Sequence, residues 1–350
     1  MIILSNCLSD KTDEGTLKIV NNLTKRIKKY DPETIVVTYE RYSQLTDIYV
    51  HISPFFRKIK LMISYQLRRV LKDSGTAVLF IPPPAKMISN ALRTFSLSKY
   101  ARCGLSVIMV MQLPVCRLAK LLFRISRANI ITFSRDAACY YRRVLANNIV
   151  YIKTGIDTEK FNAVSQEEKI ALRKKYGLPV DKPIVVHAGH LKKGRNISQL
   201  LKIDERFHVV LVASTLMADE QDKRLRTELE SKNNVTLIDS YLPNIEEIYQ
   251  LSDVYFFPVQ RAGNCVDIPL SVLEAAACNI PIVSTPYGEL KEIMQCPGFF
   301  EIAAFDKKTI NDRLCEAVQC HLNVRDAVLP YEWENAVQIL LKLNNKECNV

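Results

Sequence analysis

The sequence lacks the cysteine and histidine spacings that mark metal sites. Its 350 residues include ten cysteines and five histidines, but no paired CxxC, and the nearest grouping is Cys315, Cys320 and His321. The first ten residues, MIILSNCLSD, have too short an apolar run and no basic flank for a secretion signal. The longest apolar stretch, near 105–116, is too short and too interrupted to cross a bilayer. These absences predict reduced core thiols, no metal site and a cytoplasmic location.

Acidic residues are scarce in the first half of the chain. Residues 1–150 hold 24 Lys and Arg against 9 Asp and Glu, whereas the remaining residues hold 24 against 28. A basic half of this kind predicts an anionic partner, either nucleic acid or an anionic membrane leaflet. No segment resembles a nucleic-acid module, and aromatic residues do not alternate with the basic ones as a base-stacking platform requires. We therefore predict a membrane surface and no nucleic acid as the partner.

Two basic amphipathic segments are candidates for that membrane contact. The first is 52–72. In the second, Arg117, Lys120, Arg124 and Arg127 follow one another at steps of three, four and three, which places them in one helical stripe beside apolar residues. Helices of this kind can lie on an anionic bilayer, at about 1 kcal/mol for each well-placed basic residue. The alternative is a surface helix whose apolar side packs on a sheet and whose basic side is solvated.

Short apolar runs alternate with helical patterns along the whole chain. This alternation predicts an α/β protein with mainly parallel sheets, helices on both faces, and ligands at the carboxyl ends of the strands. A chain of this length usually forms two domains. The predicted strands are 1–4, 34–38, 77–81, 106–111, 129–133, 149–152, 183–188, 208–213, 235–238, 254–259 and 281–284, and a polar segment at 157–182 separates the first six from the rest.

The segment 254–285 carries the strongest candidate site. An apolar strand leads through a polar loop into a helix predicted over 268–278, and Asn279 ends that helix. The helix N-terminus offers an anion unpaired N–H groups and the positive end of the helix dipole. Asp267 stands at its mouth, and Glu274 lies two turns inside on roughly the same face. A carboxylate buried there needs hydrogen-bond donors, which sugar hydroxyls would supply. In the alternative interpretation, Asp267 caps the helix and Glu274 is solvated.

Two segments carry a resemblance to a known family. The letters DIPLSVLEAAACNIPIVSTPYGELKEI, from Asp267 onward, resemble the donor-binding signature of retaining glycosyltransferases of the GT-B fold, family 4 type (group 1). The letters TGIDTEKF, from Thr154, resemble the G-[IV]-D-x-x-x-F motif of the same enzymes. The resemblance implies two Rossmann-like domains facing an interdomain cleft. These domains are residues 1–153 with a C-terminal crossover helix at about 331–350, and residues 183–330, joined by a linker at 154–182.

In this family, two acids separated by seven residues contact the donor, a nucleoside diphosphate sugar. Glu274 matches the second acid, which implies a contact with the ribose hydroxyls. Val266 stands where the first is expected and Asp267 follows one residue late, so either Asp267 replaces it as the catalytic-site acid through a shifted loop or the contact is lost. The other donor residues that the resemblance implies are Gly189, His190, Lys193 and Arg195 at the diphosphate, Tyr241 and Leu242 at the nucleobase, and Ile268, Pro269, Leu270 and Ser271 at the helix start.

The resemblance places the acceptor on the first domain. Gly15 stands where the family has a glycine-rich loop, and Gln112 follows the central strand where the family often has a histidine. The implied function is transfer of a sugar, with retained anomeric configuration and without cofactor or metal, to a hydroxyl of a saccharide or lipid-linked acceptor. Cell-surface polysaccharide or glycolipid synthesis at the inner face of the membrane is the expected setting. The alternatives are a non-catalytic, membrane-associated sugar-nucleotide-binding partner of another transferase and a sugar-nucleotide epimerase of the same fold.

Overall fold

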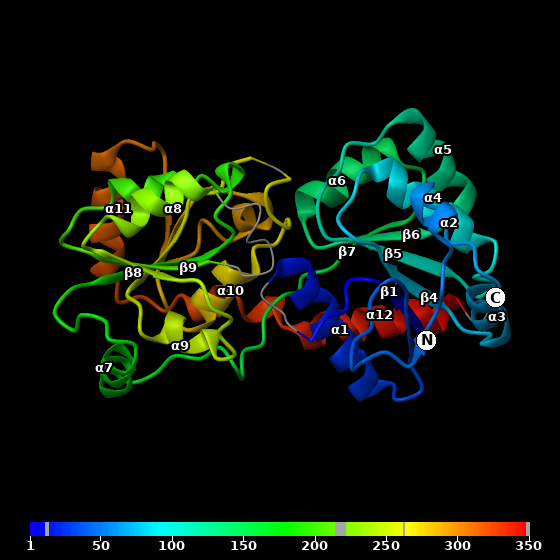
Figure 1. Ribbon diagram of the computed structural model, residues 1–350, viewed down its shortest axis with the longest axis horizontal. Helices are drawn as coiled ribbons and strands as arrows, with labels where there is room; N and C mark the ends of the chain where they lie inside the picture. The colour runs from blue at the N-terminus through cyan, green and yellow to red at the C-terminus, as the bar shows by residue number, and fades with distance from the viewer. Residues whose placement is uncertain (11–13, 214–221, 262, 348–350) are drawn as a thin grey trace. The chain divides into compact units, whose positions relative to one another are not determined.

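The protein is described by a computed structural model, in which the chain divides into two compact units. Unit 1 comprises Met1–Thr154, Val266–Ile268 and the C-terminal segment from Trp333, and unit 2 comprises Gly155–Cys265 and Pro269–Glu332. Each unit is built around one parallel sheet (Figure 1). The residues that the structure describes are 1–10, 14–213, 222–261 and 263–347, without the side chains of Lys193 and of residues 344–347.

The sheet of unit 1 has seven parallel strands in the order β3-β2-β1-β4-β5-β6-β7. The strand order runs outward in both directions from β1 and β4. Their following loops therefore leave the carboxyl edge side by side and diverge to opposite faces, where α/β sheets bind ligands. The strands are β1 (Ile2–Ser5), β2 (Ile35–Thr38), β3 (Ile48–Tyr49), β4 (Val78–Ile81), β5 (Leu105–Met109), β6 (Asn129–Thr132) and β7 (Ile149–Tyr151).

Helices cover both faces of this sheet (Figure 1). Helices α3 to α6 bury their apolar sides in one core with alternate residues of the strands, among them Leu4, Phe80 and Val107. Helix α1 lies on the other face, where α12 packs against it and Arg26 Nε stands 2.9 Å from Glu334 Oε1. The helices are α1 (Gly15–Tyr30), α2 (Pro54–Lys58), α3 (Tyr65–Asp73), α4 (Met87–Ser98), α5 (Arg117–Ser126), α6 (Arg135–Val144) and α12 (Trp333–Glu347).

The basic segment 52–72 does not form one amphipathic helix, so that prediction is wrong. Helix α2 ends at Lys58 and α3 begins at Tyr65, and Lys60 between them has a φ of 62°, in the left-handed region. A contact with another helix stabilises this break, because the buried Met62 donates its backbone N–H to Ser96 Oγ of α4 at 2.8 Å. A tertiary hydrogen bond of this kind outweighs a helical sequence pattern over so short a stretch.

Unit 2 has a six-stranded parallel sheet in the order β10-β9-β8-β11-β12-β13. Helices α8 and α11 and the 3-10 helix η2 share a core with one face, and α7, α9 and α10 lie on the other (Figure 1). The strands are β8 (Ile184–Gly189), β9 (His208–Ala213), β10 (Val235–Ile238), β11 (Val254–Phe257), β12 (Ile282–Ser284) and β13 (Phe299–Glu301). The helices are α7 (Gln166–Lys175), η1 (Lys193–Arg195), η2 (Ile197–Lys202), α8 (Lys223–Glu230), α9 (Ile245–Gln250), α10 (Leu270–Ala277), η4 (Gly288–Glu292), α11 (Lys307–Val318), η5 (Arg325–Ala327) and η6 (Leu329–Tyr331).

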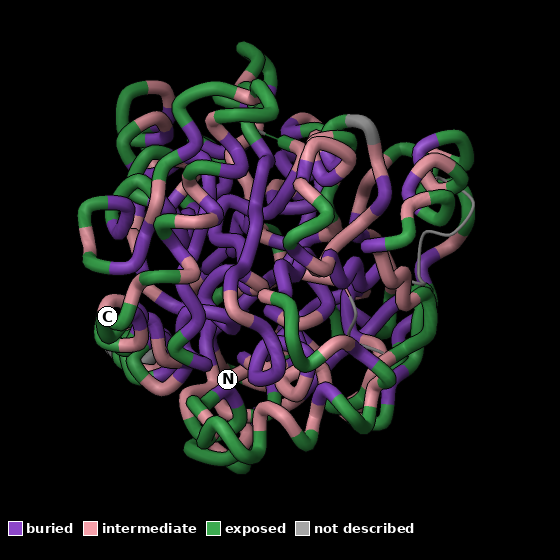
Figure 2. The backbone as a smooth tube through the Cα atoms, turned by 90° about the vertical axis from the view of Figure 1, so that its left-hand side faces the viewer, coloured by how far each residue is buried: buried purple, intermediate pink, exposed green. Residues whose placement is uncertain are grey.

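Local sequence fixes several helix ends. The Ser134 hydroxyl accepts the N–H of Ala137 and begins α6. Asn279, with a φ of 60°, ends α10, and its Oδ1 then accepts the N–H of Val324 at 2.8 Å. Figure 2 shows the resulting pattern, in which buried positions lie along the strands and on the inner sides of helices, and exposed positions on loops and outer helix faces.

Two glycines of unit 2 allow the effect of backbone strain on stability to be compared with that of steric clash. Gly298 (φ 82°) and Gly177 (φ 66°) both adopt the left-handed region, but a Cβ on Gly298 would lie 2.3 Å from Val324 Cγ2, whereas none of the described atoms lies within 4 Å of one on Gly177. We expect Gly298→Ala to lower the free energy of unfolding by about 2–4 kcal/mol and Gly177→Ala by about 1 kcal/mol. Scanning calorimetry of the two variants measures the difference, and equal losses would contradict the steric account.

Candidate functional site

The candidate site of unit 2 lies at the carboxyl edge of its sheet. β8 stands between β9 and β11, so the loops that follow β8 and β11 leave the edge next to each other. Gly189 is the last residue of β8, and the turn after it carries His190, whose carbonyl accepts the N–H of Lys192 at 2.9 Å. The turn continues into η1, where Arg195 donates its N–H to Lys192 O at 2.9 Å. The backbone therefore folds back on itself at the position predicted for a diphosphate.

Gly189 sits where a side chain would collide with two nitrogen-bearing groups. A Cβ there would lie 3.2 Å from His187 Nε2 and 3.3 Å from Arg195 Nη1. Arg195 Nε is buried and has no hydrogen-bond acceptor among the described residues. A guanidinium with an unused N–H beside a partly exposed glycine backbone suits a phosphate oxygen.

His187 is a core residue of unit 2. It is fully buried, its ring stacks between those of Tyr255 and Phe257, and its Nδ1 lies 2.8 Å from Phe256 O. Since a carbonyl oxygen only accepts, Nδ1 carries the proton and the ring is neutral. Burial lowers the pKa of His187 to about 4, and the charge of Arg195 acts in the same direction.

The loop after β11 reaches back to η1. A Cβ on Gly194 would lie within 3.0 Å of three side-chain atoms of Asn264, so only glycine allows this approach. Tyr287 holds the same loop by donating its hydroxyl to Cys265 O at 2.7 Å and receiving the Cys265 N–H at 3.2 Å. The side chain of Lys193, which the sequence places at the diphosphate, lies outside the described part of the structure.

Glu274 is buried in α10 and is not a solvated helix residue. It is 4% exposed, and its Oε2 accepts the hydroxyl of Tyr249 in α9 at 2.9 Å. Burial beside this carboxylate raises the pKa of Tyr249 well above its ordinary value, so the phenol remains the donor. The motif identifies Glu274 in the sequence, but nothing there identifies Tyr249, because the periodicity of α9 indicates only a packing helix.

The start of α10 differs by one or two residues from the prediction. The helix begins at Leu270 with Pro269 as its N-cap residue, so Asp267 does not cap it. Ile268, Pro269 and Leu270 are buried, and Ser271 is partly exposed. Burial raises the pKa of the Tyr255 phenol, and a hydrogen bond with the Ser271 side chain acts against that rise.

Asp267 is grouped with unit 1 rather than with the sheet edge that carries Gly189. It is 5% exposed, and its backbone N–H donates to Val110 O at 3.1 Å, just beyond β5. Its charge also contributes to a raised pKa of Tyr141, for which burial is the largest cause. A buried carboxylate beside the carboxyl end of β5 lies at the edge of the sheet where α/β folds bind ligands.

The remaining predicted donor residues lie after β10. Tyr241 is 39% exposed and Leu242 partly exposed, both on the turn that leads into α9. Their positions at the carboxyl side of the sheet agree with a pocket wall, and no contact of the described residues fixes that role. It stays a prediction.

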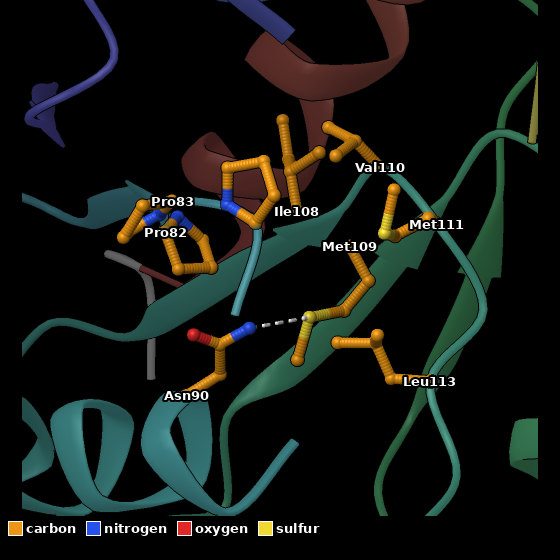
Figure 3. Close-up of a pocket in the computed structure, with 9 residues that line it drawn as sticks. Pro82, Pro83, Asn90, Ile108, Met109, Val110, Met111 and Leu113 are labelled. Carbon is orange, nitrogen blue, oxygen red and sulfur yellow. Dashed lines mark hydrogen bonds between the residues drawn. The ribbon is translucent and has the colours of Figure 1, made fainter. Parts of the chain in front are cut away.

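On the acceptor side, Gly15 begins α1 and packs closely on the segment that holds Asp267. A Cβ on Gly15 would lie 3.3 Å from Val266 Cγ2. Gln112 is partly exposed and follows β5 between Met111 and Leu113. Both of these neighbours line an apolar pocket with Pro82, Asn90 and Met109 (Figure 3).

The four predicted membrane-contact residues are all exposed. Arg117, Lys120 and Arg124 lie on α5, and Arg127 ends it with a φ of 53°. Among the described residues, no three His, Cys, Asp or Glu side chains are grouped as metal ligands. The nine cysteines in those ranges are free thiols.

Residues 168–319 match the model of the family described as glycosyl transferases group 1. The resemblance of unit 2 to this family is confirmed. Over 155 residues the chain is 24% identical to the alpha-galactosylglucosyldiacylglycerol synthase of Streptococcus pneumoniae, and that match covers 42% of this chain but only 40% of the relative. The chain therefore matches less than half the length of this relative.

Two solved structures share the whole fold. A glycosyltransferase from Rickettsia africae aligns with a TM-score of 0.77 at 12% identity, over 99% of this chain and 98% of that one. The Anabaena protein Alr3699/HepE, solved in complex with UDP and glucose, aligns with a TM-score of 0.74 at 15% identity, over 98% of each chain. The predicted α/β class, with two parallel sheets and the GT-B fold, is confirmed.

The buried His187 predicts a pH dependence of stability. Its pKa falls from 6.5 to about 4 on folding, so the unfolded state binds the extra proton. Stability is complete above pH 6.5 and falls by up to about 3 kcal/mol as the pH drops to about 4. We expect His187→Asn to flatten this part of the profile and the exposed His321→Asn to leave it unchanged, as measured by urea unfolding between pH 4 and 7.5. A profile that keeps its slope in His187→Asn would contradict the assignment.

Proposed function

We propose that the protein transfers a sugar from a nucleoside diphosphate sugar to a hydroxyl of a saccharide or lipid-linked acceptor, with retained anomeric configuration. The observation that carries the proposal is the family match over residues 168–319, which includes Gly189, Arg195 and the buried Glu274. The fold neighbour solved with UDP and glucose supports a UDP-sugar as the donor. The relative named for a glycolipid supports a lipid acceptor.

The groups around Gly189 suit the departing diphosphate. Arg195 has an unused N–H, and the first N–H groups of α10 have no acceptor within the helix. Lys193 and Arg195 supply positive charge in the sequence that follows β8. Donors fixed in place before the reaction stabilise the charge that develops on the leaving group, and we propose that these cations do so without a metal ion.

The proposed reaction needs no base from the protein. The bond between the sugar and the diphosphate oxygen breaks, and the acceptor hydroxyl oxygen forms its bond on the same face of the sugar. The hydroxyl proton passes to the departing diphosphate oxygen. Gln112, which lies where the family often has a histidine, has no ionisable group to take that proton.

The donor site is tested with nucleotides and a pair of matched carboxylates. Glu274 and Glu289 are both buried in unit 2, and each accepts a tyrosine hydroxyl at 2.9 Å, from Tyr249 and Tyr331. A nucleotide at about 100 times its dissociation constant should stabilise the protein by about 2.7 kcal/mol. We expect Glu274→Gln to weaken binding at least about tenfold, since a ribose hydroxyl loses a charged acceptor. Glu289→Gln should lower stability and leave binding intact.

Thermal shift measures both variants against a panel of nucleoside diphosphates and their sugars. No shift with any nucleotide, or equal weakening in the two variants, would refute the donor site. Binding without sugar transfer or hydrolysis, with and without EDTA, would refute the transferase.

We propose further that α5 attaches the protein to an anionic membrane surface. Leu118, Leu121 and Ile125 are 54%, 52% and 49% exposed, and they lie beside the exposed cations of the same helix. An apolar strip flanked by cations matches the boundary between lipid headgroups and acyl chains. Among the helices of described residues, none is long and apolar enough to cross a membrane.

Vesicle binding tests this surface. Replacing Arg117, Lys120, Arg124 and Arg127 by Gln should weaken binding to phosphatidylglycerol-rich vesicles about a thousandfold, at about 1 kcal/mol for each cation. The control removes the same charge from unit 2 by replacing the exposed Lys174, Lys182, Lys223 and Lys308. Cosedimentation gives the affinities. Equal losses of vesicle affinity in the two variants would show that binding depends on net charge alone. This result would contradict a specific membrane-binding surface on α5.

A further inference from the structure

Arg93 is a buried arginine that has no carboxylate partner among the described residues. It lies in α4 and is 9% exposed. Its one hydrogen bond within the described ranges runs from Nη1 to Asn90 Oδ1 at 3.3 Å, and no ion pair involves it there. Because burying a guanidinium is costly unless a counter-charge and acceptors surround it, its unused N–H groups call for acceptor atoms.

A second unused donor lies close to this guanidinium. Tyr39, directly after β2, is 1% exposed, and its hydroxyl has no hydrogen-bond partner among the described residues. Burial raises the pKa of Tyr39, and the positive charge of Arg93 acts against that rise. The charge of Arg93 acts in the same way on the pKa of Cys7, directly after β1, which burial raises to about 12.

Two carboxylates of this region have other partners among the described residues. Glu14 caps α1 by accepting the N–H of Leu17 at 3.2 Å, and Glu40 accepts Asn6 Nδ2 at 3.0 Å. Since Arg93 acts on Tyr39 and Cys7, its guanidinium lies near the ends of β2 and β1, at the carboxyl edge of the sheet. Both the guanidinium and the Tyr39 phenol have N–H or O–H groups without an acceptor among the described residues. This edge includes the point between β1 and β4 at which the strand order reverses.

Asn90 connects Arg93 to the apolar pocket of Figure 3. Its Oδ1 accepts from Arg93, while its Nδ2 lies 4.0 Å from Met109 Sδ and points into the pocket wall. The other lining residues are apolar: Pro82, Pro83, Pro84, Ile108, Met109, Val110, Met111 and Leu113. The apolar wall of the pocket therefore lies next to the unused donors of Arg93 and Tyr39 and to the positive charge of Arg93.

We propose that Arg93, with Asn90 and the Tyr39 hydroxyl, binds an oxyanion of the acceptor, and that the pocket beside Asn90 holds an apolar part of the same molecule. The proposal rests on the proposed function, since the acceptor is its ligand. Asp267 places negative charge near Val110, at the other end of the pocket, so the anion lies at the Asn90 end. An acceptor with a phosphate or carboxylate next to an apolar chain fits both parts.

Calorimetric titration with hexyl phosphate tests this site in the full-length protein saturated with UDP. Inorganic phosphate and hexanol are the comparison ligands, since each carries only one of the two features. Arg93→Met removes the charge and keeps the length, Arg93→Lys keeps the charge, and Arg102→Met is the control at an exposed arginine of the same unit. We expect hexyl phosphate to bind more tightly than either comparison ligand. Arg93→Met should weaken its binding about 10- to 100-fold, Arg93→Lys less, and Arg102→Met not at all.

Several results would overturn the proposal. They are no binding of hexyl phosphate to the unaltered protein, equal binding of hexanol, or unchanged affinity in Arg93→Met. If inorganic phosphate binds as tightly as hexyl phosphate, the site binds free anions, and the proposal of an acceptor with an apolar part is wrong. If Arg93→Met does not fold, Asn90→Ala and Arg93→Lys test the proposal instead. Both variants must then weaken the binding of hexyl phosphate and leave the binding of hexanol unchanged. UDP titration of the same samples measures the donor site separately. Failure of the proposed oxyanion site can therefore be distinguished from failure of the donor site.

Discussion

Parallel pairing is the constraint on which the placement of every candidate residue depends. In a parallel sheet all carboxyl ends meet at one edge, and each following loop must turn back across a face. Gly189 at the end of β8 and the start of the loop after β11 reach the edge of the unit 2 sheet for this reason. Tyr39 and Met111 reach the edge of the unit 1 sheet in the same way. The polar candidate residues of both units therefore lie on the loops at this edge and on the helices that pack against the sheet.

The central strands are so apolar that polar groups among them need specific partners. Glu274 has the Tyr249 hydroxyl, His187 has the Phe256 carbonyl, and Glu289 has the Tyr331 hydroxyl. Each pairing joins residues far apart in sequence, so each also fixes how two elements pack. Arg93 differs, because Asn90 satisfies only one of its N–H groups. A buried group that the fold leaves partly satisfied is more informative about ligands than one that the fold satisfies fully.

The sequence predicted most strands, because runs such as those that became β1, β8 and β11 are short, apolar and bounded by turn residues. It also predicted the end of α10 at Asn279, since that end depends on local chemistry. Glu274 was found in the same way, by its place in a motif. The short edge strands β3 and β13 were missed, because two or three residues carry no periodic signal.

Long-range pairings set what the sequence did not predict. The break between α2 and α3 depends on Ser96, which lies 34 residues after its partner Met62. Tyr249 and Tyr39 looked like ordinary core aromatics, since nothing in a periodic pattern distinguishes a phenol that meets a carboxylate from one that meets none. The same limit applies to Arg93, whose isolation from carboxylates appears only when three strand ends are brought together.

The chain order of unit 1 has a consequence for its assembly. Its apolar helix α1 is covered by α12, whose buried residues Trp333, Ala336 and Val337 lie at the far end of the sequence. On the ribosome, α1 therefore emerges more than 300 residues before the helix that covers it. Nearly all of unit 2 is synthesised in between, so it can complete its sheet while unit 1 still exposes an apolar face. Unit 1 can therefore bury this face of α1 only after the residues of unit 2 have been synthesised.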